Sequence, residues 1–112
     1  LPRQMPERVA MELALTGDFI AAERAYELGL INRVVGSGRA LAAAQEMAGK
    51  IAANGPLAVA ASMMVISQAQ DWALDEAAQK QGEYLDPVFS SEDAIEGATA
   101  FAEKRAPQWK GL

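Results

Sequence analysis

The chain has 112 residues, with 15 acidic and 10 basic side chains, no cysteine and no histidine. The missing cysteines exclude a disulfide framework, a thiolate nucleophile and Cys-ligated metals, and the missing histidines exclude Ser-His-Asp chemistry and most zinc sites. The net charge of −5 disfavours general affinity for nucleic acid or anionic membranes. Because 24 residues are alanine and only 7 are aromatic, we expect an all-α chain with an aliphatic core.

Two short helices are expected in the first part of the chain. The first covers residues 4–15 and ends near Gly17, and the second covers residues 20–28 and ends at Gly29. The β-branched residues that follow predict a brief extended segment, with at most one short strand near residues 31–35. No basic and apolar leader pattern opens the sequence, and we expect a cytoplasmic protein.

The middle of the chain contains the most apolar segment. Apolar residues at helical spacing predict a helix over residues 39–53, and Gly55-Pro56 should separate it from a second helix that continues towards residue 70. Only residues 57–66 are densely apolar, about half the length that a bilayer requires. We therefore expect this second helix to be buried on most sides inside the protein or at an interface.

Two helices are expected in the last third. One runs from residue 73 to about residue 85, and Pro87 should end or bend it. The other begins at Ser90-Ser91, where a hydroxyl can cap free amides and three nearby carboxylates complement the helix dipole. Pro107 should stop this last helix and leave a short tail.

The acidic residues and the glycine loop give no catalytic site. Glu23 with Glu27, and Glu92 with Glu96, share a helix face at a spacing of four, but neither pair has a metal-binding companion or an apolar setting that would raise a pKa. Solvated helix faces are the better explanation. The Gly-Ser-Gly loop at residues 36–38 has neither P-loop nor dinucleotide-binding spacing. We assign no catalytic residue and no metal ligand.

A cluster of cations and aromatic rings near the C-terminus has two explanations. It consists of Phe101, Lys104, Arg105, Trp109 and Lys110. Such a group could hold a phosphate and stack a flat ring. Alternatively, the cations complement the negative end of a helix and the aromatic tail packs on the body. The residues alone favour the second explanation.

Two stretches of the sequence resemble the enoyl-CoA hydratase/isomerase (crotonase) family. Near the start these are Leu1-Pro2-Arg3, Leu15-Thr16-Gly17, Gly29-Leu30-Ile31-Asn32 and Val34-Val35; near the end they are Ser91-Glu92-Asp93-Ala94, Glu96-Gly97, Ala100-Phe101, Glu103-Lys104-Arg105, Pro107, Trp109 and Gly111. The resemblance covers the whole chain in order. It implies the C-terminal part of such an enzyme, with residues 1–35 ending the catalytic core and residues 36–112 forming a helical oligomerisation domain.

The resemblance implies an activity whose catalytic groups precede this chain. The family's core of ββα turns supplies the oxyanion-hole amides and the acid/base glutamates that act on acyl-CoA thioesters. Hydration of a 2-enoyl-CoA is the expected reaction, although isomerase, dehalogenase and hydrolase members share this C-terminal pattern. The 112 residues alone are then expected to be inactive. A non-enzymatic helical oligomerisation or interaction module remains the alternative.

The resemblance assigns two substrate-binding residues. Phe101 matches a position that lines the acyl or CoA pocket in some members, and Lys104 matches a lysine that reaches a CoA phosphate, often in the site of a neighbouring subunit. With the resemblance added, the ligand-binding explanation of the C-terminal cluster becomes the preferred one, for Lys104 more than for Trp109. No separate cofactor is implied, because coenzyme A enters as part of the substrate. The expected partners are the acyl-CoA, the missing core, and identical subunits in a trimer or a dimer of trimers.

Overall fold

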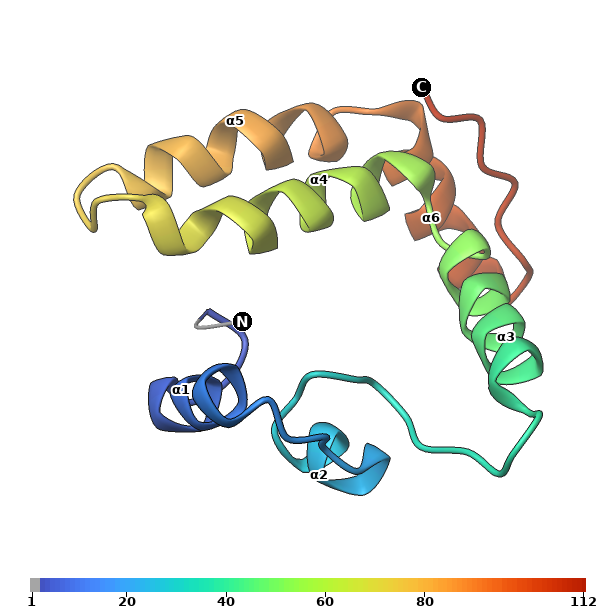
Figure 1. The fold of residues 1–112 in the computed structure, drawn as a ribbon. Coiled ribbons are helices and arrows are strands. Elements are labelled where there is room, and N and C mark those ends of the chain that lie inside the picture. The colour runs from blue at the N-terminus through green and yellow to red at the C-terminus, as the bar shows by residue number, and fades with distance from the viewer. Residues whose placement is uncertain (1–2) are drawn as a thin grey trace. The chain divides into compact units, whose positions relative to one another are not determined.

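Helices account for all the regular secondary structure in residues 3–112, the part of the chain that the computed structural model describes (Figure 1). The described residues contain no strand, so the predicted all-α fold is confirmed and residues 31–35 form a loop. The motif that opens with Leu1 and Pro2 falls partly outside the described residues. In chain order the elements are α1 (Glu7–Thr16), α2 (Ala22–Glu27), α3 (Ala40–Ala52), α4 (Pro56–Gln68), the 3₁₀ turn η1 (Ala69–Asp71), α5 (Ala77–Phe89) and α6 (Glu92–Glu103).

The chain divides into two compact units, Leu1–Ala44 and Gln45–Leu112, and the boundary falls inside α3. This division concerns compactness only. The predicted roles of residues 1–35 as the end of a catalytic core, and of residues 36–112 as an oligomerisation domain, stay predictions.

Glycines end both helices of the first unit. Gly17 follows α1 with a φ of 72°, and its amide donates to the Leu13 carbonyl. Gly29 follows α2 with a φ of 75°, and its amide donates to the Tyr26 carbonyl at 3.0 Å. A left-handed residue just past a helix satisfies the last free carbonyls, and glycine adopts that conformation without a steric penalty. Both predicted helix ends are confirmed.

Helices α4 and α5 form an antiparallel hairpin in the second unit (Figure 1). The predicted break is confirmed, because Gly55 precedes α4 and Pro56 is its first residue. At the far end of the hairpin the rings of Trp72 and Tyr84 stack, with centroids 6.3 Å apart and planes 5° from parallel. The Tyr84 hydroxyl donates to the Gln68 side chain at 2.9 Å, so the turn is fastened to both helices.

The predicted bounds of α5 are wrong at both ends. Residues 73–76 form a turn, in which the Glu76 amide donates to the Ala73 carbonyl, and the helix then continues through Pro87 to Phe89. A proline so close to the end of a helix removes only one backbone bond. The last turn is held by other donors, since the amide and the hydroxyl of Ser90 both donate to the Asp86 carbonyl.

The apolar helix α4 is not buried within this chain. Ala61 is buried, but the Met63 and Ile66 side chains are 66% and 75% exposed. Leu57, Val59 and Val65 are half-buried, whereas Met63, Met64 and Ile66 are exposed. The expectation that α4 lies buried at an interface therefore stays a prediction. Among the described residues, no single helix is long and apolar enough to cross a bilayer. Helix α3 and the segment Pro56–Asp71 reach that length and composition only when they are counted together, and the chain bends by 110° between them.

Candidate functional site

Several hydrogen bonds converge on the start of α6. Ser91 caps the helix as predicted: its hydroxyl accepts from the Ala94 amide at 3.1 Å and donates to the Val88 carbonyl at 2.6 Å. Two residues later, Asp93 is only 5% exposed. A carboxylate buried in this way needs hydrogen bonds to offset the loss of water.

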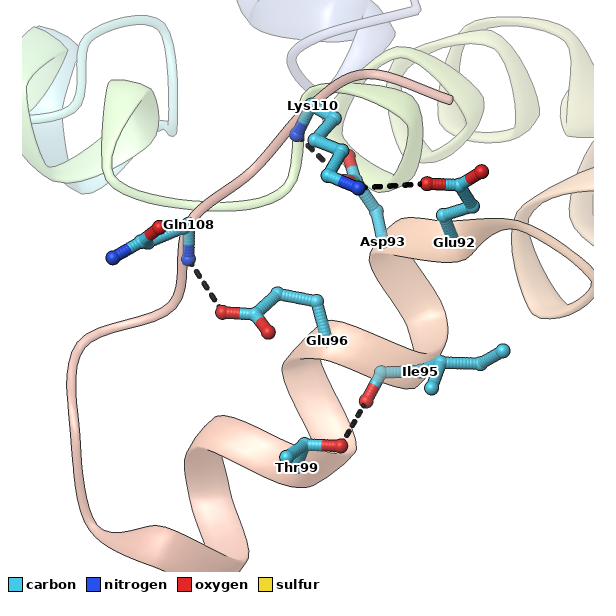
Figure 2. Close-up of a pocket in the computed structure, with 7 residues that line it drawn as sticks. All are labelled: Glu92, Asp93, Ile95, Glu96, Thr99, Gln108 and Lys110. Atoms are coloured by element: carbon cyan, nitrogen blue, oxygen red, sulfur yellow. Dashed lines mark hydrogen bonds and ion pairs between the residues drawn. The ribbon is translucent and has the colours of Figure 1, made fainter.

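Asp93 obtains those bonds from the C-terminal tail. One carboxylate oxygen accepts from the Lys110 amide at 2.7 Å, and the other accepts from the Gly111 amide at 2.9 Å. The Asp93 amide in turn donates to the Leu112 carbonyl at 3.2 Å. Figure 2 shows the tail passing over this end of α6. The tail is thus part of the folded unit.

Two further acids of α6 bind the same tail. Glu96 accepts from the Gln108 amide at 2.7 Å, and the Lys110 ammonium lies 3.0 Å from a Glu92 oxygen (Figure 2). The side chains of Glu92, Glu96, Gln108 and Lys110 line part of an open cavity of about 310 Å³ between α6 and the tail. The expectation that Glu92 and Glu96 simply form a solvated helix face is wrong for Glu96, whose side chain is 23% exposed and ion-paired.

Arg105 is the main cause of the altered acidity of Glu96. Its guanidinium donates two parallel bonds to the Glu96 carboxylate, at 2.6 and 2.9 Å, and a third from Nε to Glu103 at 2.6 Å. These bonds and the Gln108 amide lower the pKa of Glu96 to about 2. Conversely, the Glu96 and Glu103 carboxylates raise the pKa of Arg105. In the same way, the bond to Glu92 raises the pKa of Lys110.

Trp109 has a structural role. Its indole Nε1–H donates to the Ala53 carbonyl just past α3 at 2.8 Å. The ring lies over two glycines: a Cβ on Gly55 would be 3.5 Å from it, and a Cβ on Gly97 would be 3.1 Å from it. A methyl group at Gly97 would force the ring to move. The tail is therefore anchored by an aromatic ring as well as by carboxylates.

Lys104 and Phe101 remain at the surface. The Phe101 ring is 88% exposed, and Lys104 is exposed one helical turn later, at the end of α6. Lys104 has a φ of 55° and a ψ of 39°, the left-handed conformation. Within residues 3–112 its ammonium forms no ion pair, whereas Arg105 and Lys110 are both paired.

The structure thus divides the C-terminal cluster in two. Arg105, Trp109 and Lys110 hold the tail: Trp109 packs on the body as the structural explanation predicts, but Arg105 and Lys110 pair with carboxylates of α6, and the last turn of that helix contains no basic residue. Phe101 and Lys104 take no part in these contacts. Sequence reasoning missed Asp93 as the residue that binds the tail. The acids at 92 and 96 and the cations at 105 and 110 are a signal for the ion pairs of the tail, but not for Asp93, which binds backbone amides. Within the described residues no group of three acidic side chains is placed to hold a metal ion.

Comparisons with known proteins show which sequences and structures the chain is similar to. The family model described as enoyl-CoA hydratase/isomerase matches residues 1–112. The chain is 46% identical over 110 residues to enoyl-CoA hydratase EchA19 of Mycobacterium tuberculosis, covering 98% of this chain and 41% of that protein. It is 38% identical over 115 residues to a carnitinyl-CoA dehydratase of Proteus mirabilis, covering 99% of this chain and 44% of the relative.

A solved structure shows the same backbone. The crystal structure of an enoyl-CoA hydratase from M. tuberculosis H37Rv superimposes with a TM-score of 0.97 and 53% sequence identity, over 100% of this chain and 44% of that one. The chain therefore spans less than half the length of the relatives that it matches.

Replacing Asp93 by alanine should release the tail. The Lys110 and Gly111 amides would lose their acceptor, and we expect a loss of about 1–3 kcal/mol in the free energy of unfolding. Denaturant titration measures this loss, and hydrogen exchange at the two amides should accelerate. The matched control is Asp75→Ala in an exposed turn, which should change stability by less than about 0.5 kcal/mol. Equal effects of the two substitutions would refute the role of Asp93.

Acid should weaken the Glu96 contacts within a defined pH range. Folding lowers the pKa of Glu96 from 4.5 to about 2, so its contribution to stability is complete above pH 4.5 and is lost as the pH falls towards 2. We expect Glu96→Gln to lose the part of the acid dependence that arises in this range. Thermal unfolding between pH 7 and pH 2.5, with Glu23→Gln in the other unit as control, measures the difference. Parallel curves for wild type and Glu96→Gln would contradict the assignment.

Proposed function

This chain belongs to the enoyl-CoA hydratase/isomerase family, and on that premise we propose that it forms the C-terminal helical part of an enzyme that acts on acyl-CoA thioesters. The reaction we propose is hydration of a 2-enoyl-CoA. The family match along all 112 residues supports this, as do the names of two relatives, a hydratase and a dehydratase, which both denote the transfer of water. A module sharing only its architecture with the family would not be 46% identical to one member.

The observation that carries the proposal for this site is the backbone of Lys104. Among the described residues five have a positive φ; four are glycines, and the fifth is Lys104. Glycine is the usual residue at this position after a helix, and a side chain there costs conformational energy. Such an outlier points to a function when the surrounding structure enforces it. Here the strained residue is an exposed cation that forms no ion pair with any residue from 3 to 112.

The chemistry of Lys104 and Phe101 fits a coenzyme A ester. An unpaired ammonium can bind a phosphate oxygen through a charge-assisted hydrogen bond, and an exposed ring one turn away can pack on the apolar part of the ligand. We propose that Lys104 binds a phosphate of the CoA moiety and that Phe101 lines the acyl or CoA pocket. No catalytic residue is assigned to this chain; the proposed core supplies the amides that stabilise the thioester enolate and the glutamates that move protons.

We further propose that the protein assembles as a trimer or a dimer of trimers in the cytoplasm. The exposed apolar side chains of α4 support an interface, because an alanine-rich helix with outward Met63 and Ile66 presents apolar surface that a close neighbour would cover. Sedimentation velocity of the enzyme measures its oligomeric state.

A hybrid enzyme tests the proposed function. Residues 1–112 would replace the matching segment of the M. tuberculosis enoyl-CoA hydratase, whose backbone superimposes at a TM-score of 0.97. We expect the hybrid to hydrate crotonyl-CoA, measured as loss of the conjugated thioester absorbance, and the 112-residue chain alone to be inactive. A folded hybrid with an intact core but no hydration would overturn the proposal.

Replacing Lys104 by glycine should separate stability from binding. Glycine relieves the left-handed strain, so we expect unfolding to require up to about 1 kcal/mol more. Loss of the charge should raise KM for the CoA ester roughly tenfold and leave kcat nearly unchanged. Lys50→Ala, which removes a lysine paired with Glu46 on α3, is the control and should leave KM unchanged. An unchanged KM in Lys104→Gly would refute the proposed phosphate contact.

A further inference from the structure

The end of α6 carries a feature that the proposed phosphate contact does not by itself explain. Lys104 keeps a left-handed backbone, which costs an L-residue conformational energy that glycine would not incur. The Lys104 amide donates to the Phe101 carbonyl at 3.2 Å, and the Arg105 amide donates to the Ala100 carbonyl at 3.0 Å. This is the hydrogen-bond pattern of a Schellman ending, in which glycine normally occupies the position of Lys104. Something else must hold the lysine there.

The Arg105 side chain provides that restraint. Arg105 directly follows Lys104, and its guanidinium donates two bonds, of 2.6 and 2.9 Å, to Glu96 in the middle of α6. Its Nε also binds Glu103, directly before Lys104, at 2.6 Å, and Nη1 donates to the Ala106 carbonyl at 3.2 Å. A bidentate guanidinium–carboxylate pair fixes geometry more strictly than a single bond. The backbone is therefore held on both sides of Lys104.

The same contacts decide the partners of the Lys104 ammonium. Glu103 is its neighbour in sequence, and Glu96 lies on the same helix; both are carboxylates that could pair with a lysine. Arg105 occupies both of them. Within residues 3–112 the ammonium is consequently left without an ion pair, as an anion-binding group requires.

We infer that the Arg105–Glu96 pair is a positioning device for Lys104: it imposes the left-handed turn that presents the ammonium, and it keeps the neighbouring carboxylates from neutralising it. Arg105 itself does not contact the ligand. This inference rests on the proposed function, in which Lys104 binds a phosphate of the CoA ester. Breaking either member of the pair should weaken CoA binding through Lys104 and leave the chemical step intact.

The backbone part of the inference is tested on the 112-residue chain by NMR. In the wild type, the Cα and Cβ shifts of Lys104 and a strong contact between its own amide and Hα protons should report a positive φ. We expect Arg105→Gln and Glu96→Gln to lose these signatures. Lys110→Ala, which breaks a comparable ion pair of the tail with Glu92, should retain them. A positive φ at Lys104 that survives both pair variants would overturn the inference.

The ligand part is tested by the KM of the hybrid enzyme for crotonyl-CoA. We expect Arg105→Gln and Glu96→Gln each to raise KM roughly threefold to tenfold with kcat nearly constant, and Lys110→Ala to leave both constants unchanged. Because the pair acts through Lys104, adding Arg105→Gln to Lys104→Gly should raise KM no further. Arg105→Lys retains the charge but not the bidentate geometry, so it should resemble Arg105→Gln.

The outcomes separate the two proposals. If Lys104→Gly leaves KM unchanged, the phosphate contact is wrong, whatever the NMR shows. If Lys104→Gly raises KM but the pair variants do not, the phosphate contact stands and the positioning role is overturned. If Arg105→Gln raises KM while Glu96→Gln does not, or if the effects of Arg105→Gln and Lys104→Gly multiply, Arg105 binds the ligand directly and the positioning role is again overturned.

Discussion

The buried carboxylate of Asp93 is the contact on which the rest of the C-terminal region depends. It lies at the start of α6, where Ser91 caps the helix, and it accepts the amides of Lys110 and Gly111. Removing a carboxylate from water is costly unless charge-assisted hydrogen bonds replace the lost hydration. The tail amides therefore stabilise the buried Asp93 carboxylate, and the carboxylate in turn fixes the tail. This mutual requirement brings the tail back along α6. Trp109 then reaches the end of α3, and Gln108 reaches Glu96.

Once the tail is fixed, the pairing of charges follows. The path of the tail brings the Lys110 ammonium to Glu92, and Arg105 turns back to Glu96. Two of the three cations near the C-terminus are thereby used inside the fold. Lys104 is the third, and it lies at the one position in the described chain where a side chain occupies a left-handed backbone. The distinction between the two paired cations and Lys104 thus arises from the fold of the tail, although all three belong to the same short basic segment.

Local sequence signals predicted the elements well and their partners poorly. The helix ends at Gly17 and Gly29 and the cap at Ser91 could be predicted because each depends on one residue and its immediate neighbours. The bounds of α5 could not, because the effect of Pro87 depends on which hydroxyl and amide groups reach the last turn. The roles of Asp93 and Trp109 depend on contacts 17 and 56 residues away in sequence, which helical periodicity does not encode. The residues alone placed Lys104 in the C-terminal cluster, and only the family resemblance singled it out as a substrate-binding residue.

The net charge of −5 and an anionic ligand are compatible because the relevant charge is local. A helix C-terminus carries a partial negative charge from its free carbonyls, so the end of α6 would by itself repel a phosphate. The turn at Lys104 changes this in two ways: the amides of Lys104 and Arg105 satisfy the Ala100 and Phe101 carbonyls, and the lysine places an ammonium just past them. A glycine would make the same backbone bonds with less strain, but it would leave the negative end of the helix without a cation. The cost of the left-handed backbone at Lys104 is therefore offset in part by the cation that it places at the negative end of α6.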